Sequence, residues 1–116
     1  MIKEDVIELI QELNEKQTET ISIEVKSAKR GVPEKFYDTI SSFSNTLGGV
    51  ILFGVEEIKK KSKTIFEIVG VNDVNELQKN ITNLCCKEFE PVIRPEIDVI
   101  EIDKKNIVAV RIEMLN

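Results

Sequence analysis

Apolar and polar residues follow helical periods in three segments of the chain. In residues 3–16 apolar side chains recur every three or four positions, which is the spacing of one helix face. The same spacing returns in a segment that Pro33 opens, a residue suited to the first helical position, and that ends at Gly48. A third stripe covers residues 74–85. The pattern therefore predicts three amphipathic helices.

Five shorter segments have the patterns of strands. Residues 21–26 alternate between apolar and polar side chains, as in a half-buried strand, whereas residues 50–55 are apolar on both faces, as in a central strand. Residues 57–63 are charged and predict a solvated connection. The remaining predicted strands are residues 65–71, 97–102 and 107–112, the last two joined by a hairpin turn at residues 103–106.

The order of these segments is helix, strand, helix, strand, strand, helix, strand, strand. It predicts an α+β fold, in which two or three helices pack on one face of a mixed sheet of about five strands. With 116 residues the chain is long enough for one domain with a sizeable core, and neither a repeat nor a linker divides it. We expect residues 1–116 to form a single domain.

The composition of the chain limits the kinds of binding and catalysis that it can support. The chain has 16 basic and 21 acidic residues, so its net charge is −5, which argues against tight non-specific binding to nucleic acids but leaves room for a local basic patch. Histidine is absent, so any catalysis would depend on carboxylates, lysine, tyrosine or serine. The two cysteines, Cys85 and Cys86, are adjacent and offer no zinc site.

The amino-terminal residues are charged, and no apolar run approaches the roughly 18 residues of a membrane span. We therefore expect an intracellular, cytoplasmic protein without a membrane partner.

The glycine pair Gly48–Gly49 follows a predicted helix and precedes a predicted strand. Phosphate-binding loops have the opposite order, with the glycines between a strand and the start of a helix. We interpret the pair, with Gly54 farther along, as structural turns, and ATP binding at this loop is the less favoured alternative.

Acidic residues near one strand suggest a metal site. Glu24 and Lys26 project to the same side because strand side chains alternate, and Glu19 precedes the strand closely enough to turn toward that side. Glu56 and Glu57 end the apolar strand, so Glu57 would join Glu24 if the two strands are neighbours. Carboxylates beside a lysine suit Mg²⁺ or Mn²⁺ chemistry on phosphodiesters. A surface ion pair and a solvated strand end are the simpler alternatives.

Two motifs carry a family resemblance. They are Glu19-x₄-Glu24-x-Lys26, and the stretch from Phe43 through the glycine pair to Gly54-Val-Glu-Glu57. Over about residues 10–114 the chain resembles the Schlafen-type Alba-like domain. The resemblance implies that family's α+β fold and a DNA-binding role, often as the N-terminal module of longer transcription regulators or helicase-related proteins. Domains of this family were once labelled as divergent ATPase domains.

In animal Schlafens, two such lobes cleave structured RNA with three acids and a divalent metal. The resemblance places those acids at Glu19, Glu24 and Glu57. It also places the family's lysine, which follows the second acid, at Lys26. The third acid is aspartate in the cleaving members, and one methylene shifts a ligand by about 1 Å. This chain has one lobe, so a two-lobed channel would require a homodimer.

Three functions follow as hypotheses. The first is a module that binds DNA or RNA and needs no cofactor; its candidate contacts are Lys26, Lys29, Arg30, Lys35, Lys59 and Lys60, followed by Lys61. The second is a nuclease dependent on Mg²⁺ or Mn²⁺, and the third is a nucleotide-binding domain. For the lysines, a purely solubilising role is the alternative.

Overall fold

The protein is described here by a computed structural model that covers residues 1–29 and 31–115. Its helices are α1 (Lys3–Lys16), α2 (Phe36–Asn45) and α3 (Val74–Lys87). Its strands are β1 (Ile23–Lys26), β2 (Gly49–Phe53), β3 (Val55–Lys59), β4 (Thr64–Ile68), β5 (Glu96–Ile102) and β6 (Lys105–Ile112). The described residues thus confirm the predicted α+β class.

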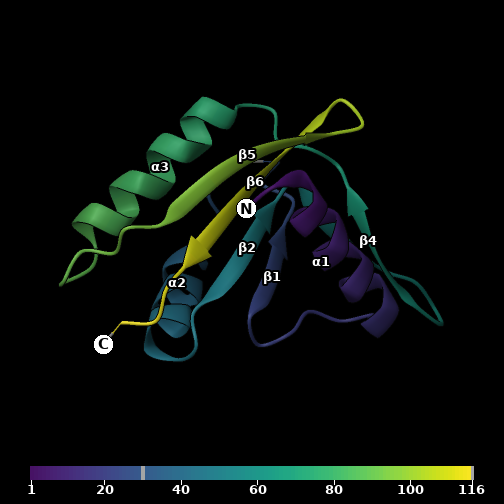
Figure 1. Cartoon of the computed structure of the whole chain (residues 1–116), viewed down its shortest axis with the longest axis horizontal. Coiled ribbons are helices and arrows are strands. Elements are labelled where there is room, and N and C mark those ends of the chain that lie inside the picture. Colours follow the sequence, from purple (N-terminus) through teal and green to yellow (C-terminus); the bar gives the residue numbers. More distant parts are fainter. Residues whose placement is uncertain (30, 116) are drawn as a thin grey trace.

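The strands form two sheets. The larger is mixed and has the order β1-β2-β6-β5, in which β1 runs parallel to β2 and the other pairs are antiparallel. The smaller is the antiparallel hairpin of β3 and β4. Figure 1 shows this hairpin beside α1, on the side of the molecule away from α2 and α3.

Gly54 turns the chain out of the large sheet. Its φ of +97° is accessible to glycine, and a Cβ there would lie 2.9 Å from the Asn106 carbonyl oxygen. The Gly54 N–H donates to the Lys26 carbonyl, and the Gly54 carbonyl accepts from the N–H groups of Val69 and Gly70. The chain therefore leaves β2 and enters β3 in a fixed direction.

The prediction of one strand at residues 50–55 and a charged connection at residues 57–63 was wrong at this turn. Glu56 and Glu57 do not end β2; they lie inside β3, opposite Glu67 and Phe66 of β4. Backbone hydrogen bonds hold this strand, and most of its side chains are only partly buried. The sequence therefore lacks the apolar alternation from which a strand is recognised.

Both faces of the large sheet are covered. On β2, Ile51 and Phe53 pack with α2 and α3, while Leu52 packs on the other side with α1 and the β3–β4 hairpin. Strand β6 divides in the same way, with Val110 on the first side and Ala109 on the second. The expectation that the helices share one face was therefore wrong for α1, which Figure 1 shows on the opposite side of the sheet from α2.

Some element boundaries differ from the prediction. Helix α2 begins at Phe36 because Pro33 lies in a preceding turn, where its carbonyl accepts the Phe36 N–H. Ile21 precedes β1 and is 82% exposed. The hairpin predicted near the C-terminus is confirmed: Asp103 and Lys104 have φ values of 51° and 64°, as a two-residue turn requires. None of the helices in the described ranges is long and apolar enough to cross a membrane.

Candidate functional site

A cleft of about 340 Å³ lies between β1 and α2. The connection from α1 to β1 forms one end of its lining. The charged residues that line the cleft are Glu19, Glu24, Lys26, Lys35 and Asp38. These three acids and two lysines make the cleft weakly negative.

Glu24 and Lys26 lie on the same side of β1, as the alternation of a strand requires. The Glu24 Oε2 is 3.8 Å from the Lys26 Nζ, while Ile23 and Val25 are buried on the opposite side with α1. The Thr39 hydroxyl of α2 donates to the same Glu24 oxygen at 2.7 Å. Glu24 therefore already has a cation and a hydroxyl donor within the protein.

Glu19 is held at the start of the site by the backbone. Its Oε2 accepts the Val25 N–H at 2.7 Å. Burial raises the pKa of Glu19 above its ordinary value, and the charges of Glu24 and Glu57 raise it further, against the Val25 hydrogen bond and Lys26, which lower it. The three acids named by the resemblance therefore share one electrostatic neighbourhood.

This neighbourhood is not an assembled metal centre. Carboxylate oxygens are the donors that Mg²⁺ prefers, but the Glu57 Oε1 lies 3.6 Å from the Lys59 Nζ, and Glu19 and Glu24 accept the hydrogen bonds given above. Within residues 1–29 and 31–115, no three His, Cys, Asp or Glu side chains are grouped so that they could hold a metal ion. As they stand, the three acids do not fit a divalent ion.

Several of the candidate lysines are paired with acids. Besides Lys26, Lys29 has its Nζ 3.3 Å from the Glu56 Oε2, so the basic turn after β1 contacts the start of β3. Lys35 is exposed on the cleft, and Lys60 is exposed in the turn after β3. Arg30, another candidate, lies outside the described residues.

The glycine pair serves packing between α2, β2 and β6. Gly48 has a φ of +77°, and its N–H donates to the Phe43 carbonyl at 2.8 Å. A Cβ on Gly48 would lie 2.6 Å from the Ile112 carbonyl oxygen, and one on Gly49 would lie 2.8 Å from the Phe43 ring. These contacts account for both glycines without a bound phosphate.

The polar face that α2 turns toward β1 was not predicted from the sequence. Asp38, Thr39 and Ser42 line the cleft with Lys35. Their spacing from Lys35 is three, four and seven residues, which is the spacing of one helix face. That spacing was visible in the sequence, but only the strand's position shows that this face lies opposite Glu24.

The comparisons with known proteins agree with this fold. The sequence profile of the family described as Schlafen, AlbA_2 matches residues 19–115. The chain belongs to this family. The match begins at Glu19 and includes every acid and lysine discussed above. No curated protein sequence has a significant similarity to the chain.

A solved structure resembles this Schlafen AlbA_2 domain. It is the solution NMR structure of the N-terminal domain of a RecG-related protein from Nitrosomonas europaea. The two are 22% identical with a TM-score of 0.75, and the match covers 94% of this chain and 72% of the other. This similarity shows a shared fold.

Proposed function

We propose that this Schlafen AlbA_2 domain is a nucleic-acid-binding module of a transcription regulator or helicase-related protein. The observation that carries the proposal is a set of lysines on neighbouring parts of the fold: Lys35 lines the cleft, Lys29 follows β1 and contacts β3, and Lys59 ends β3. Membership of the family, and the fold shared with the N-terminal domain of a RecG-related protein, support the same class.

The contact between Lys29 and Glu56 brings the basic turn after β1 next to the start of β3. From Glu56, β3 extends for three residues to Lys59, a distance of about 10 Å at the rise of a strand. Lys35 comes after the basic turn in the sequence, and its side chain lines the cleft. A surface of this length would contact several phosphates of one nucleic acid and would do so without reading bases.

Binding is tested by fluorescence anisotropy with labelled duplex DNA, single-stranded DNA and folded RNA. In EDTA, with salt raised from about 50 to 200 mM, we expect affinity to fall steeply because bound lysines release counterions. Lys29→Gln and Lys35→Gln should each weaken binding severalfold, whereas Lys79→Gln on α3 should not. An absence of binding, or binding that salt does not change, would contradict the proposal.

A second candidate is a nuclease dependent on Mg²⁺ or Mn²⁺. It is favoured by one observation: the charges of Glu24 and Glu57 both act on Glu19. Among the described residues, Glu24 is paired with Lys26 and Glu57 with Lys59. It also requires the three side chains to regroup, because they form no ligand set as they stand.

The nuclease hypothesis is tested on the same substrates with Mn²⁺ and with EDTA. Shortened product that requires both the metal and Glu24 would support it. Product in EDTA, or product that survives Glu24→Ala, would contradict it. The family's two-lobed cleavage site further implies a homodimer, which sedimentation with and without RNA would detect.

A further inference from the structure

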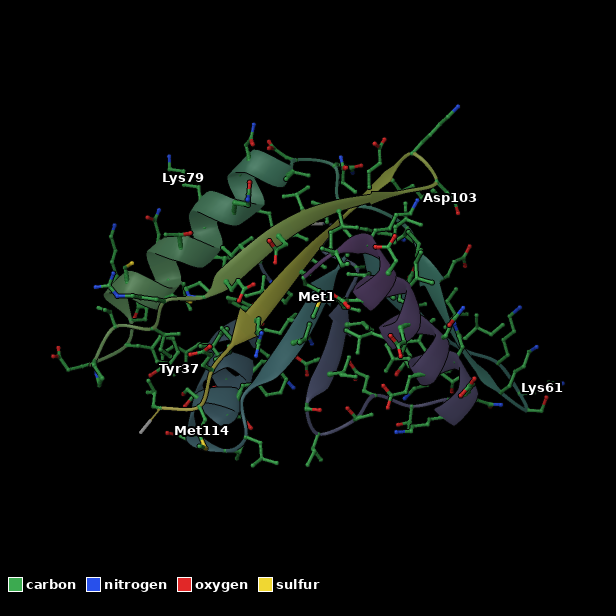
Figure 2. All side chains as sticks on the ribbon, viewed as in Figure 1. Met1, Tyr37, Lys61, Lys79, Asp103 and Met114 are labelled. Carbon is green, nitrogen blue, oxygen red and sulfur yellow. The ribbon has the colours of Figure 1, made fainter. Side chains whose placement is uncertain are left out.

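The turn between β3 and β4 holds an unusual concentration of positive charge. Residues 59–63 read Lys-Lys-Lys-Ser-Lys, and all five are exposed. The Lys60 N–H donates to the Lys63 carbonyl at 2.8 Å, which closes the turn. Figure 2 shows Lys61 at the outermost end of the molecule, at the opposite end from α3.

This charge contrasts with the rest of the chain. Without the four lysines of residues 59–63, the chain would have 12 basic and 21 acidic residues and a net charge of −9. Among the residues that the structure describes, Lys59 is the one member of the four that pairs with an acid, Glu57. The cleft lysine Lys26 and the turn lysine Lys29 both have acidic partners. Among the described residues, the hairpin tip therefore groups three lysines, Lys60, Lys61 and Lys63, that form no ion pair.

Helix α1 braces the hairpin from its outer edge. The Asn14 side chain accepts the Phe66 N–H at 2.8 Å and donates to the Phe66 carbonyl at 3.2 Å. The Gln17 side chain accepts the Thr64 N–H at 3.3 Å, close to the tip. On the inner side Val55 and Phe66 are buried in the core with α1. A hairpin fixed in this way has little backbone entropy left to lose when its lysines bind.

We propose that the β3–β4 hairpin is an arm that places its lysine turn on the phosphate backbone of a nucleic-acid duplex. This inference rests on the proposed function and makes the arm, rather than the weakly negative cleft, the main source of affinity. A duplex carries about one charge per 1.7 Å of its axis, which suits four clustered lysines. Residues 59–63 include no aromatic side chain on which an unpaired base could stack, so a duplex is favoured over a single strand.

An anionic membrane fits this arm less well. A membrane is an extended negative plane, and a protein lying on it would bring acidic surface near the lipid headgroups as well as lysines. A duplex is a narrow cylinder, so it can meet the arm and the neighbouring basic turn without covering the rest of the acidic surface. In addition, the tip residues include no apolar side chain that could enter a bilayer.

The test compares two triple variants with the same net charge. The arm variant is Lys60→Gln, Lys61→Gln and Lys63→Gln; the control is Lys79→Gln, Lys87→Gln and Lys104→Gln, all exposed positions away from the arm. On a labelled 20-base-pair duplex in EDTA at about 100 mM salt, we expect the arm variant to bind at least about tenfold more weakly. Its slope of log affinity against log salt should shrink by about two to three, roughly one per lost lysine.

The control variant should lose less than about threefold, and an arm variant with arginine at the same three positions should keep the affinity. Far-UV circular dichroism verifies that each variant is folded. If the wild type binds the duplex and both glutamine variants bind equally well, the arm proposal is wrong and the proposed function stands. If the wild type binds no nucleic acid, the proposed function fails first. Arm-dependent binding to phosphatidylserine vesicles without duplex binding would overturn both.

Discussion

At the scale of single residues, Glu19 links the fold to the candidate site. Its carboxylate is partly buried, accepts the Val25 N–H, and lies within the fields of Glu24 and Glu57. The hydrogen bond fixes the connection between α1 and β1, but the negative charge is unfavourable there. The residue is thus useful to the fold as an acceptor and costly as an anion.

Replacing Glu19 with glutamine separates these two effects, because glutamine still accepts the Val25 N–H and has no charge. The folded protein raises the pKa of Glu19 above its ordinary value of 4.5, so wild-type stability falls as pH rises from that value through the folded pKa. We expect Glu19→Gln to be more stable than the wild type near pH 7, by about 1 kcal/mol or less. The gain should vanish as pH falls toward 4.5.

Urea unfolding at several pH values between about 4 and 7 measures this difference. The control is Glu101→Gln, an exposed position on β5, which should leave the free energy of unfolding nearly unchanged at every pH. If Glu19→Gln were less stable at pH 7, the carboxylate would be stabilising as an anion, contrary to the raised pKa.

At the scale of elements, the contact between α1 and β4 decides whether the hairpin behaves as a fixed arm. Asn14→Ala removes both hydrogen bonds to Phe66 and leaves its N–H and carbonyl without their partner. We expect a loss of about 1–3 kcal/mol in the free energy of unfolding, measured in urea. Asn83→Ala is the matched control, because it makes the same change at an exposed position of α3 and gains the same helix propensity. Equal stability of the two variants would show that Asn14 does not brace the hairpin.

The same elements show what the sequence could predict. Period-two alternation placed Glu24 and Lys26 together, and the structure has them 3.8 Å apart. Strand β3 escaped prediction because backbone pairing with β4 requires no apolar pattern in Glu56 and Glu57. The stripe of α1 predicted a buried helix face, but a stripe does not tell which side of a sheet it covers. That choice depends on both faces of β2 and β6 being apolar.

At the scale of the whole molecule, positive and negative charge are separated. The arm carries four lysines, while the cleft has more acids than lysines. A nucleic acid held by the arm and by the turn after β1 would lie near the acids of the cleft. If no metal occupies them, those acids repel its phosphates, and physiological salt screens this repulsion over a Debye length of about 8 Å.

This separation predicts that losing a cleft acid strengthens binding. In EDTA at low salt, Glu24→Gln should raise affinity for duplex DNA about two- to fivefold, and the gain should shrink as salt screens the repulsion. Glu101→Gln makes the same change in net charge on β5, at the other edge of the sheet from β1, and should have little effect. Anisotropy titrations at two salt concentrations measure both.

In Mn²⁺ the two functional hypotheses diverge, because a metal-binding cleft would give the wild type a gain in affinity that Glu24→Gln removes. A binding module without a metal site would keep the variant's advantage in both buffers.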